Sequence, residues 1–161
     1  MKKLFILIIV LSITGFSCNK KCGVDKPKNI KPIDWENYND VHTVKWNFRD
    51  DCSKFPLGRT GKTIKMYGWI FHPQSVNPYL FALLSDSLFV EADNPKCAMV
   101  YVICDGDREE CTAISSKINS SDSKRKCYVM GELSIDHLAG NTCCTSEPEI
   151  LLKSSDDIYF E

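Results

Sequence analysis

Residues 61–71 of the chain read Gly61-Lys62-Thr63-Ile64-Lys65-Met66-Tyr67-Gly68-Trp69-Ile70-Phe71. Two sets of side chains alternate along this stretch, with Ile64, Met66, Gly68 and Ile70 in one set and Lys65, Tyr67, Trp69 and Phe71 in the other. Successive side chains of a strand point to opposite faces, so this period of two predicts a strand over 62–71 with one buried face. A glycine inside a strand usually marks a bulge or a sharp bend, and we expect one at Gly68.

A second stretch, Lys126-Cys127-Tyr128-Val129-Met130-Gly131-Glu132-Leu133, also alternates into a glycine and leaves it with apolar residues. Two further runs rich in β-branched and aromatic residues follow Asn77-Pro78 and Asn94-Pro95, which are typical turn pairs. These patterns predict strands over 79–84, 97–104, 127–135, 149–153 and 158–160, with a short helix over 109–118. The chain is therefore predicted to be mainly β.

The order of these elements is three strands, a polar or helical connection and then further strands. Together with the bent first strand, this order makes residues 61–160 similar to the OB fold. The resemblance implies an all-β domain, a small barrel of five to six strands with one short helix. A different barrel of that size, or a β-sandwich, has nearly the same pattern and stays an alternative. No internal repeat divides the chain, so we assign residues 33–161 to one domain.

The part of this domain before residue 61 is rich in aromatic residues, beginning with Trp35 and Tyr38. Val44, Trp46 and Phe48 alternate with polar residues, and this period of two predicts a half-buried strand. We expect this aromatic segment to pack on the barrel, because so many rings need an apolar surface to cover.

The first 18 residues have the layout of a secretory signal, with two lysines, an apolar run over 4–13 and small residues before a cysteine. The run is far shorter than the ~20 apolar residues that a spanning helix needs. Gly15-Phe16-Ser17-Cys18 resembles the lipobox of bacterial lipoproteins. That resemblance implies a signal peptide over 1–17, acyl chains on Cys18, and sorting to the outer membrane, because Asn19 stands where aspartate causes inner-membrane retention. An ordinary secretory signal with a chance cysteine is the alternative.

Residues 18–32 are polar and basic and contain two prolines, which predicts a tether that holds the domain off the bilayer. Without Lys2 and Lys3 of the leader, 18 of the 20 basic residues remain against 21 acidic ones, a net charge of −3. Such a surface argues against a nucleic acid as partner, since phosphate backbones bind basic surfaces. The membrane, reached through the lipid, is the partner that this region predicts.

Nine cysteines are present, and eight remain for other roles if Cys18 is lipidated. These eight disulfide candidates are Cys22, Cys52, Cys97, Cys104, Cys111, Cys127, Cys143 and Cys144. An even number in an exported chain predicts disulfides, although the sequence alone does not fix their connectivity. Cys104 and Cys111 flank an acidic turn and form the first pair we expect, whereas the neighbours Cys143 and Cys144 should point in different directions. No Cys-x2-Cys pair of the kind found in zinc sites occurs, so neither a metal nor a cofactor is expected.

Four aromatic residues are expected on the outer face of the barrel, namely Tyr67, Trp69, Tyr101 and Tyr128. Aromatic rings stack on sugars and on apolar peptide groups, and OB-like barrels bind oligosaccharides on such a face. We therefore expect a lipid-anchored, non-catalytic binding module for a saccharide or a protein. If the segment 35–48 covers these rings, they belong to the core instead.

Two other functions stay open. An envelope enzyme with a thiol or hydrolytic site is one, although His42, His72 and His137 are scattered and no Gly-x-Ser-x-Gly motif surrounds a serine. A structural or assembly lipoprotein without a small ligand is the other.

Overall fold

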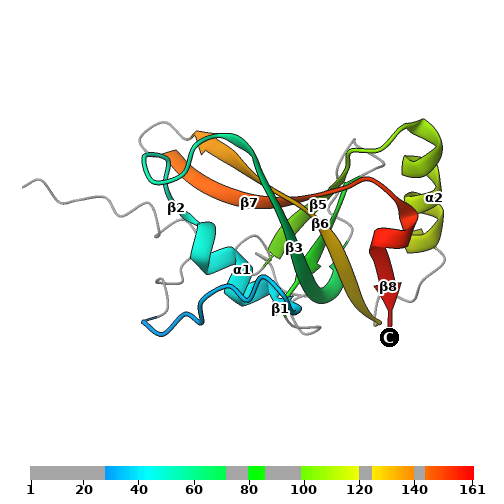
Figure 1. The fold of residues 1–161 in the computed structure, drawn as a ribbon, viewed down its shortest axis with the longest axis horizontal. Coiled ribbons are helices and arrows are strands. Elements are labelled where there is room, and N and C mark those ends of the chain that lie inside the picture. Colours follow the sequence, from blue (N-terminus) through cyan, green and yellow to red (C-terminus); the bar gives the residue numbers. More distant parts are fainter. Residues whose placement is uncertain (1–27, 72–79, 86–98, 120–124, 140–143) are drawn as a thin grey trace, which may run out of the picture.

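The computed structural model describes residues 28–71, 80–85, 99–119, 125–139 and 144–161. Five strands form a closed barrel (Figure 1): β3 (Gly58–Phe71), β4 (Leu80–Leu84), β5 (Met99–Cys104), β6 (Lys126–Ala139) and β7 (Cys144–Leu152). They follow one another around the barrel as β3-β4-β5-β7-β6, and β6 pairs again with β3. Only the β5–β7 pairing is parallel among these five. The prediction of a small all-β, OB-like barrel is confirmed.

The helix α2 (Arg108–Asn119) connects β5 to β6 and confirms the helix predicted over 109–118. Its first turn is capped by Asp107, whose carboxylate accepts a hydrogen bond of 2.9 Å from the amide of Glu110. Ile114 and Ile118 of this helix are buried in the barrel core. The acidic turn before α2 thus serves as a helix cap, which explains why aspartate stands there.

Inward-facing residues of the strands fill the barrel. On β3 these are Ile64, Met66 and Ile70, each at most 1% exposed, as the alternation predicts. Leu133 of β6 and Ile150 of β7 belong to the same core cluster and are fully buried. Burial of each such side chain contributes about 1.5–3 kcal/mol, so this core is the main source of stability.

Gly68 lies where β3 passes from one neighbour to the next. Up to Trp69 the strand pairs with β6, and from Trp69 onward it pairs with β4. A Cβ atom at Gly68 would lie 2.6 Å from the carbonyl oxygen of Leu84 and 2.6 Å from a methyl group of Val41, so no side chain fits. The register with β6 is continuous through Gly68, and the irregularity in this pairing lies between Arg59 and Thr63 instead.

The segment before the barrel forms β1 (Asn39–Asp40), α1 (Val41–Phe48) and β2 (Asp50–Asp51). The strand predicted around 44–48 is therefore wrong, because these residues are helical. Asp40 caps the helix by accepting a hydrogen bond of 2.7 Å from the amide of Thr43. Val41 and Val44, one turn apart, then enter the barrel core.

The aromatic segment packs on the barrel as expected. Figure 1 shows α1 and α2 on opposite sides of the barrel. Residues as early as Lys31 and Ile33 contact the domain: the carbonyl oxygen of Lys31 accepts a hydrogen bond from the Asn47 side chain, and Ile33 packs on the core.

The leader 1–17 and most of the predicted tether, including Cys18, lie outside the described residues. Within the described ranges no helix combines the length and the apolar character that a membrane span requires.

A short strand extends the sheet beyond the barrel. A single 3₁₀ turn (Ser155–Asp157) leads into β8 (Ile158–Phe160), which pairs with β6. This strand confirms the last one predicted from the sequence, over 158–160. Ile158 is buried, whereas Tyr159 points outward and is 62% exposed. An additional aromatic residue is thereby placed on the outer face of the sheet, beside Tyr128.

Two disulfides are present among the described residues. Cys104 and Cys111 form the expected local pair, and Cys144 pairs with Cys52 across 92 residues. Cys127 differs from the prediction: its thiol is free and fully buried. The reason is its inward position on β6, which places the sulfur among apolar core side chains. The other candidates, Cys22, Cys97 and Cys143, lie outside the described residues.

Candidate functional site

Four tyrosines gather on the outer face of the sheet around Tyr128, and we call them the tyrosine strip. Tyr67 of β3, Tyr128 of β6 and Tyr159 of β8 are direct cross-strand partners, so their rings lie side by side. The ring centre of Tyr128 is 5.6 Å from that of Tyr67 and 5.8 Å from that of Tyr159. Tyr38, just before β1, meets the same ring edge-on at 5.2 Å. Aromatic pairs at such distances stabilise one another, which fixes the rings in place.

Polar groups hold this surface in one arrangement. The ammonium group of Lys126 lies 4.3 Å from the ring centre of Tyr67 and 5.4 Å from that of Tyr128. The hydroxyl group of Tyr128 donates a hydrogen bond of 2.8 Å to Glu161, and this bond raises the pKa of the phenol. Tyr38 and Tyr159 are 42% and 62% exposed. The strip therefore presents ring faces, hydroxyl groups and two opposite charges to solvent.

An open cleft of about 690 Å³ adjoins the strip, and Tyr38 and Tyr67 belong to both. Apart from Tyr67, its lining residues all fall within 31–43, and they include Trp35. The Asn39 side chain fixes this segment, since it donates to the carbonyl oxygens of both Asp34 and Lys65. The cleft and the strip are therefore adjacent, and Tyr38 and Tyr67 line both.

The structure brings together two of the four residues predicted from the sequence to bind a ligand. Tyr67 and Tyr128 lie in the tyrosine strip. Trp69 and Tyr101 are half-buried and pack elsewhere on the outer face, with Phe71, against a small cluster of fully or almost fully buried residues, Ala82, Leu84 and Met99. Tyr38 and Tyr159 were missed by the sequence reasoning. Tyr159 follows the inward-facing Ile158 and could have been found by period two, whereas nothing in the sequence marks Tyr38.

A second polar group lies on the outer face of β6 and β7. Glu149 of β7 is the register partner of Ser134 and of Tyr101. Burial raises the pKa of Glu149 to about 7, and the nearby Asp136 carboxylate adds to the effect. Burial also raises the pKa of Tyr101, with Glu149 among the contributing charges. The Glu149 carboxyl group thus has a pKa near neutral pH.

We expect the Glu149→Gln variant to lose a pH dependence that the wild type shows. The folded state holds the Glu149 proton up to about pH 7, whereas the unfolded chain releases it near 4.5, so the free energy of unfolding falls as pH rises between these values. With allowance for solvent screening, the change amounts to about 1–2 kcal/mol. Urea titrations of both proteins at pH 5 and pH 8 measure it. An unchanged pH dependence in the variant contradicts the assignment to Glu149.

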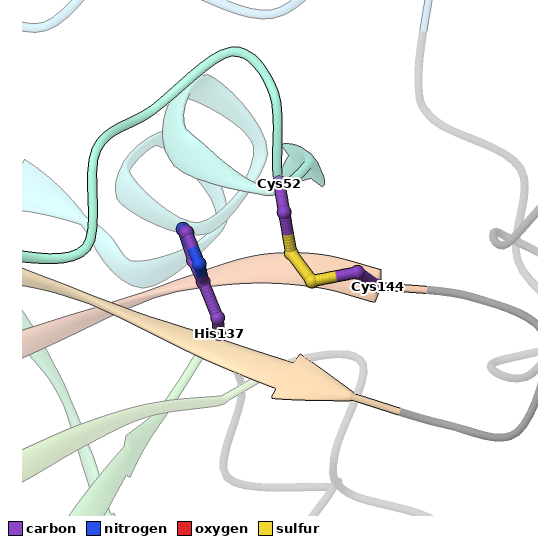
Figure 2. A group of neighbouring side chains, drawn as sticks. All are labelled: Cys52, His137 and Cys144. Atoms are coloured by element: carbon purple, nitrogen blue, oxygen red, sulfur yellow. A yellow bond between two sulfur atoms is a disulfide. The ribbon is translucent and has the colours of Figure 1, made fainter.

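Two cysteines and a histidine form a further cluster at the β2 side of the barrel (Figure 2). The sulfurs of Cys52 and Cys144 and a ring nitrogen of His137 all lie within 4.8 Å of one another, and the sulfurs are joined in the disulfide. Cysteine and histidine are the ligands that zinc prefers. Among the described residues, these three side chains form the group whose ligand atoms lie close enough together to share one metal ion.

The free thiol has the properties of a core residue. Burial raises the pKa of Cys127 to about 12, which keeps it protonated at neutral pH. A protonated, fully buried thiol is a poor nucleophile, so Cys127 gives no support to a thiol enzyme.

No model of a known protein family matches the chain, and no curated protein matches it either. The function of the chain is therefore inferred from its own residues.

Proposed function

We propose that this chain is an exported, lipid-anchored and non-catalytic binding module, and that the tyrosine strip with its adjoining cleft binds a saccharide. The observation that carries the proposal is the cluster of three tyrosine rings around Tyr128, each with its centre within 6 Å of the Tyr128 ring centre. Burial does not account for this cluster, because two of its four rings are more than two-fifths exposed. Exposed aromatic groups of this kind typically serve recognition.

A saccharide fits the chemistry of this surface. The apolar faces of sugar rings stack on aromatic rings, while their hydroxyl groups need donors and acceptors at the rim. The tyrosine hydroxyls, the ammonium group of Lys126 and the carboxylate of Glu161 provide both kinds of group. The similarity to OB-like barrels, which bind oligosaccharides on an outer face, adds support.

We expect Tyr159→Ala to weaken saccharide binding by about 5- to 150-fold, because a stacked aromatic contributes ~1–3 kcal/mol. Its free energy of unfolding should fall by no more than about 1.5 kcal/mol, because the ring is largely exposed and loses only its pairing with Tyr128. An oligosaccharide array identifies the ligand, and calorimetric titration of the strongest one measures the loss. Leu57→Ala is the control, since Leu57 is 64% exposed and directly precedes the first residue of β3, whereas Tyr67 lies in the second half of that strand.

The outcomes separate the ligand classes. If wild type and Tyr159→Ala bind the saccharide equally well, the tyrosine strip is not part of the binding site. An array without any bound saccharide, followed by a protein partner whose binding depends on Tyr159, assigns the same surface to protein recognition.

The proposed anchor makes its own prediction. Cys18→Ser should yield a chain without acyl chains that no longer partitions into detergent, because each buried methylene of a lipid contributes ~0.8 kcal/mol to membrane binding. Mass spectrometry and detergent partition of wild type and variant measure both effects. An unmodified Cys18 in the wild type, isolated from a bacterial host with the lipidation enzymes, contradicts the anchor and leaves the binding surface untouched.

A further inference from the structure

The cluster of Cys52, Cys144 and His137 gathers three potential metal ligands from distant parts of the sequence. Cys52 directly follows β2, Cys144 begins β7, and His137 lies on β6 two residues before the register partner of Cys144 (Figure 2). All three side chains are half-buried, so a reductant or a metal ion can reach them. The Cα atoms of the two cysteines are 5.5 Å apart. Pairing of β6 with β7 and of β2 with β7 holds this geometry independently of the disulfide.

The hydrogen bond of His137 determines which ring nitrogen can bind a metal. Nε2 lies 3.0 Å from the carbonyl oxygen of Phe55, and a carbonyl oxygen can only accept. Nε2 therefore carries the hydrogen, and the lone pair belongs to Nδ1. Metal-binding histidines show this arrangement, in which the second ring nitrogen donates to a backbone carbonyl and fixes the orientation of the ring. The bond to Phe55 thus prepares His137 as a ligand.

We propose that reduction of the Cys52–Cys144 disulfide creates a zinc site formed by the two cysteine sulfurs and His137. A dithiol reductant supplies two electrons and two protons: the S–S bond breaks, two thiols form, and the reductant becomes a disulfide. Zinc then binds the two thiolates, and both thiol protons pass to solvent.

The geometry accommodates the ion. Zinc–sulfur bonds of about 2.3 Å in a tetrahedral site place the two sulfurs about 3.8 Å apart. Side-chain rotation at Cys52 and Cys144 reaches this separation from the present Cα spacing of 5.5 Å without strand movement. Water completes the fourth position. Zinc would then fasten the β2–β3 loop to β7 in the reduced protein, as the disulfide does in the oxidised protein.

Cobalt titration of the full chain tests the site, because tetrahedral cobalt bound to thiolate has distinctive visible absorption. The chain is reduced with a phosphine under anaerobic conditions and freed of the phosphine before cobalt is added. We expect one equivalent to bind with tetrahedral, thiolate-containing spectra. His137→Ala and Cys52→Ser should each weaken binding by on the order of 100-fold. Cys104→Ser/Cys111→Ser is the matched control, since it removes two thiols elsewhere and should leave the spectra unchanged.

Thermal melts provide a readout that does not depend on spectra. Zinc should raise the melting temperature of the reduced wild type and not that of the oxidised wild type, because a ligand stabilises only the state that binds it. Reduced His137→Ala should show no comparable rise. The proposal is overturned if cobalt binds equally well to His137→Ala, if the Cys104→Ser/Cys111→Ser control loses the spectra, or if reduced wild type binds no cobalt.

Discussion

The Cys52→Ser/Cys144→Ser variant is expected to lose about 4.5 kcal/mol of unfolding free energy, and Cys104→Ser/Cys111→Ser only about 2.5 kcal/mol. The difference follows from the closed loops, which span 92 residues in the first disulfide and 7 in the second. A crosslink lowers the entropy of the unfolded chain, and the effect grows with the logarithm of loop length. The long-range disulfide should therefore be about twice as stabilising as the local one.

Urea titrations of the two double variants and the wild type, in buffer without reductant, measure this difference. For a domain of this size, the loss of the long-range disulfide lowers the melting temperature by roughly 15 °C. Full reduction of the wild type should lower it at least as far. Equal losses in the two variants, or a greater loss for Cys104→Ser/Cys111→Ser, would contradict loop length as the cause.

The contrast between the two disulfides also shows what the sequence can predict. Cys104 and Cys111 flank a turn, so their pairing follows from local geometry. Cys52 and Cys144 meet only because β2 pairs with β7, and no local pattern indicates that pairing. The same reason hides the position of His137, which joins them through the β6–β7 register. Contacts between distant segments thus determine both the second disulfide and the cluster around it.

The barrel strands were predictable because each strand buries one face. From Ile64 to Phe71 of β3, buried residues alternate with half-buried ones at a period of two. Tyr67 and Tyr128 could be placed on the outer face by this rule. Their approach to one ring pair depends on the register between β3 and β6, and the contact of Tyr38 depends on where the N-terminal segment packs. The sequence therefore predicts that these tyrosine side chains point outward, but it does not predict that they assemble into the tyrosine strip.

The helix α1 shows how tertiary contacts override a local pattern. The alternation of Val44, Trp46 and Phe48 predicts a strand, yet four consecutive residues from Thr43 to Trp46 are buried in the structure. A surface strand buries alternate residues, so consecutive burial requires contacts on several sides. One of these contacts is unexpected for a lysine: Lys45 is 4% exposed and forms an ion pair with Glu147 of β7. The partner lies about a hundred residues away in the sequence, so the alternation alone gave no sign of it.

Glu147 is the anion between two buried cations. Its carboxylate pairs with the ammonium group of Lys45 and lies 3.0 Å from Nε of Arg49. All three side chains are at most 8% exposed. Burial lowers the pKa of Lys45, and the Glu147 charge opposes that shift. Arg49 also stacks over Trp46, with its guanidinium carbon 5.5 Å from the ring centre. The carboxylate therefore compensates for the cost of burying both cations.

We expect Glu147→Gln to lower the free energy of unfolding by about 3–5 kcal/mol, because removal of one partner leaves buried charge without compensation. Adding Lys45→Met to this variant should recover part of the loss, since it removes one of the two uncompensated cations and keeps an unbranched apolar chain between α1 and the barrel. Lys54→Met is the control: it breaks an ion pair with Asp50 in which the lysine is 56% exposed, and should change stability by less than about 0.5 kcal/mol. Urea titrations of the four proteins at pH 7 give these values. If Glu147→Gln costs no more than Lys54→Met, hydrophobic contacts alone hold α1 against the barrel, and the buried ion pairs contribute nothing to its position.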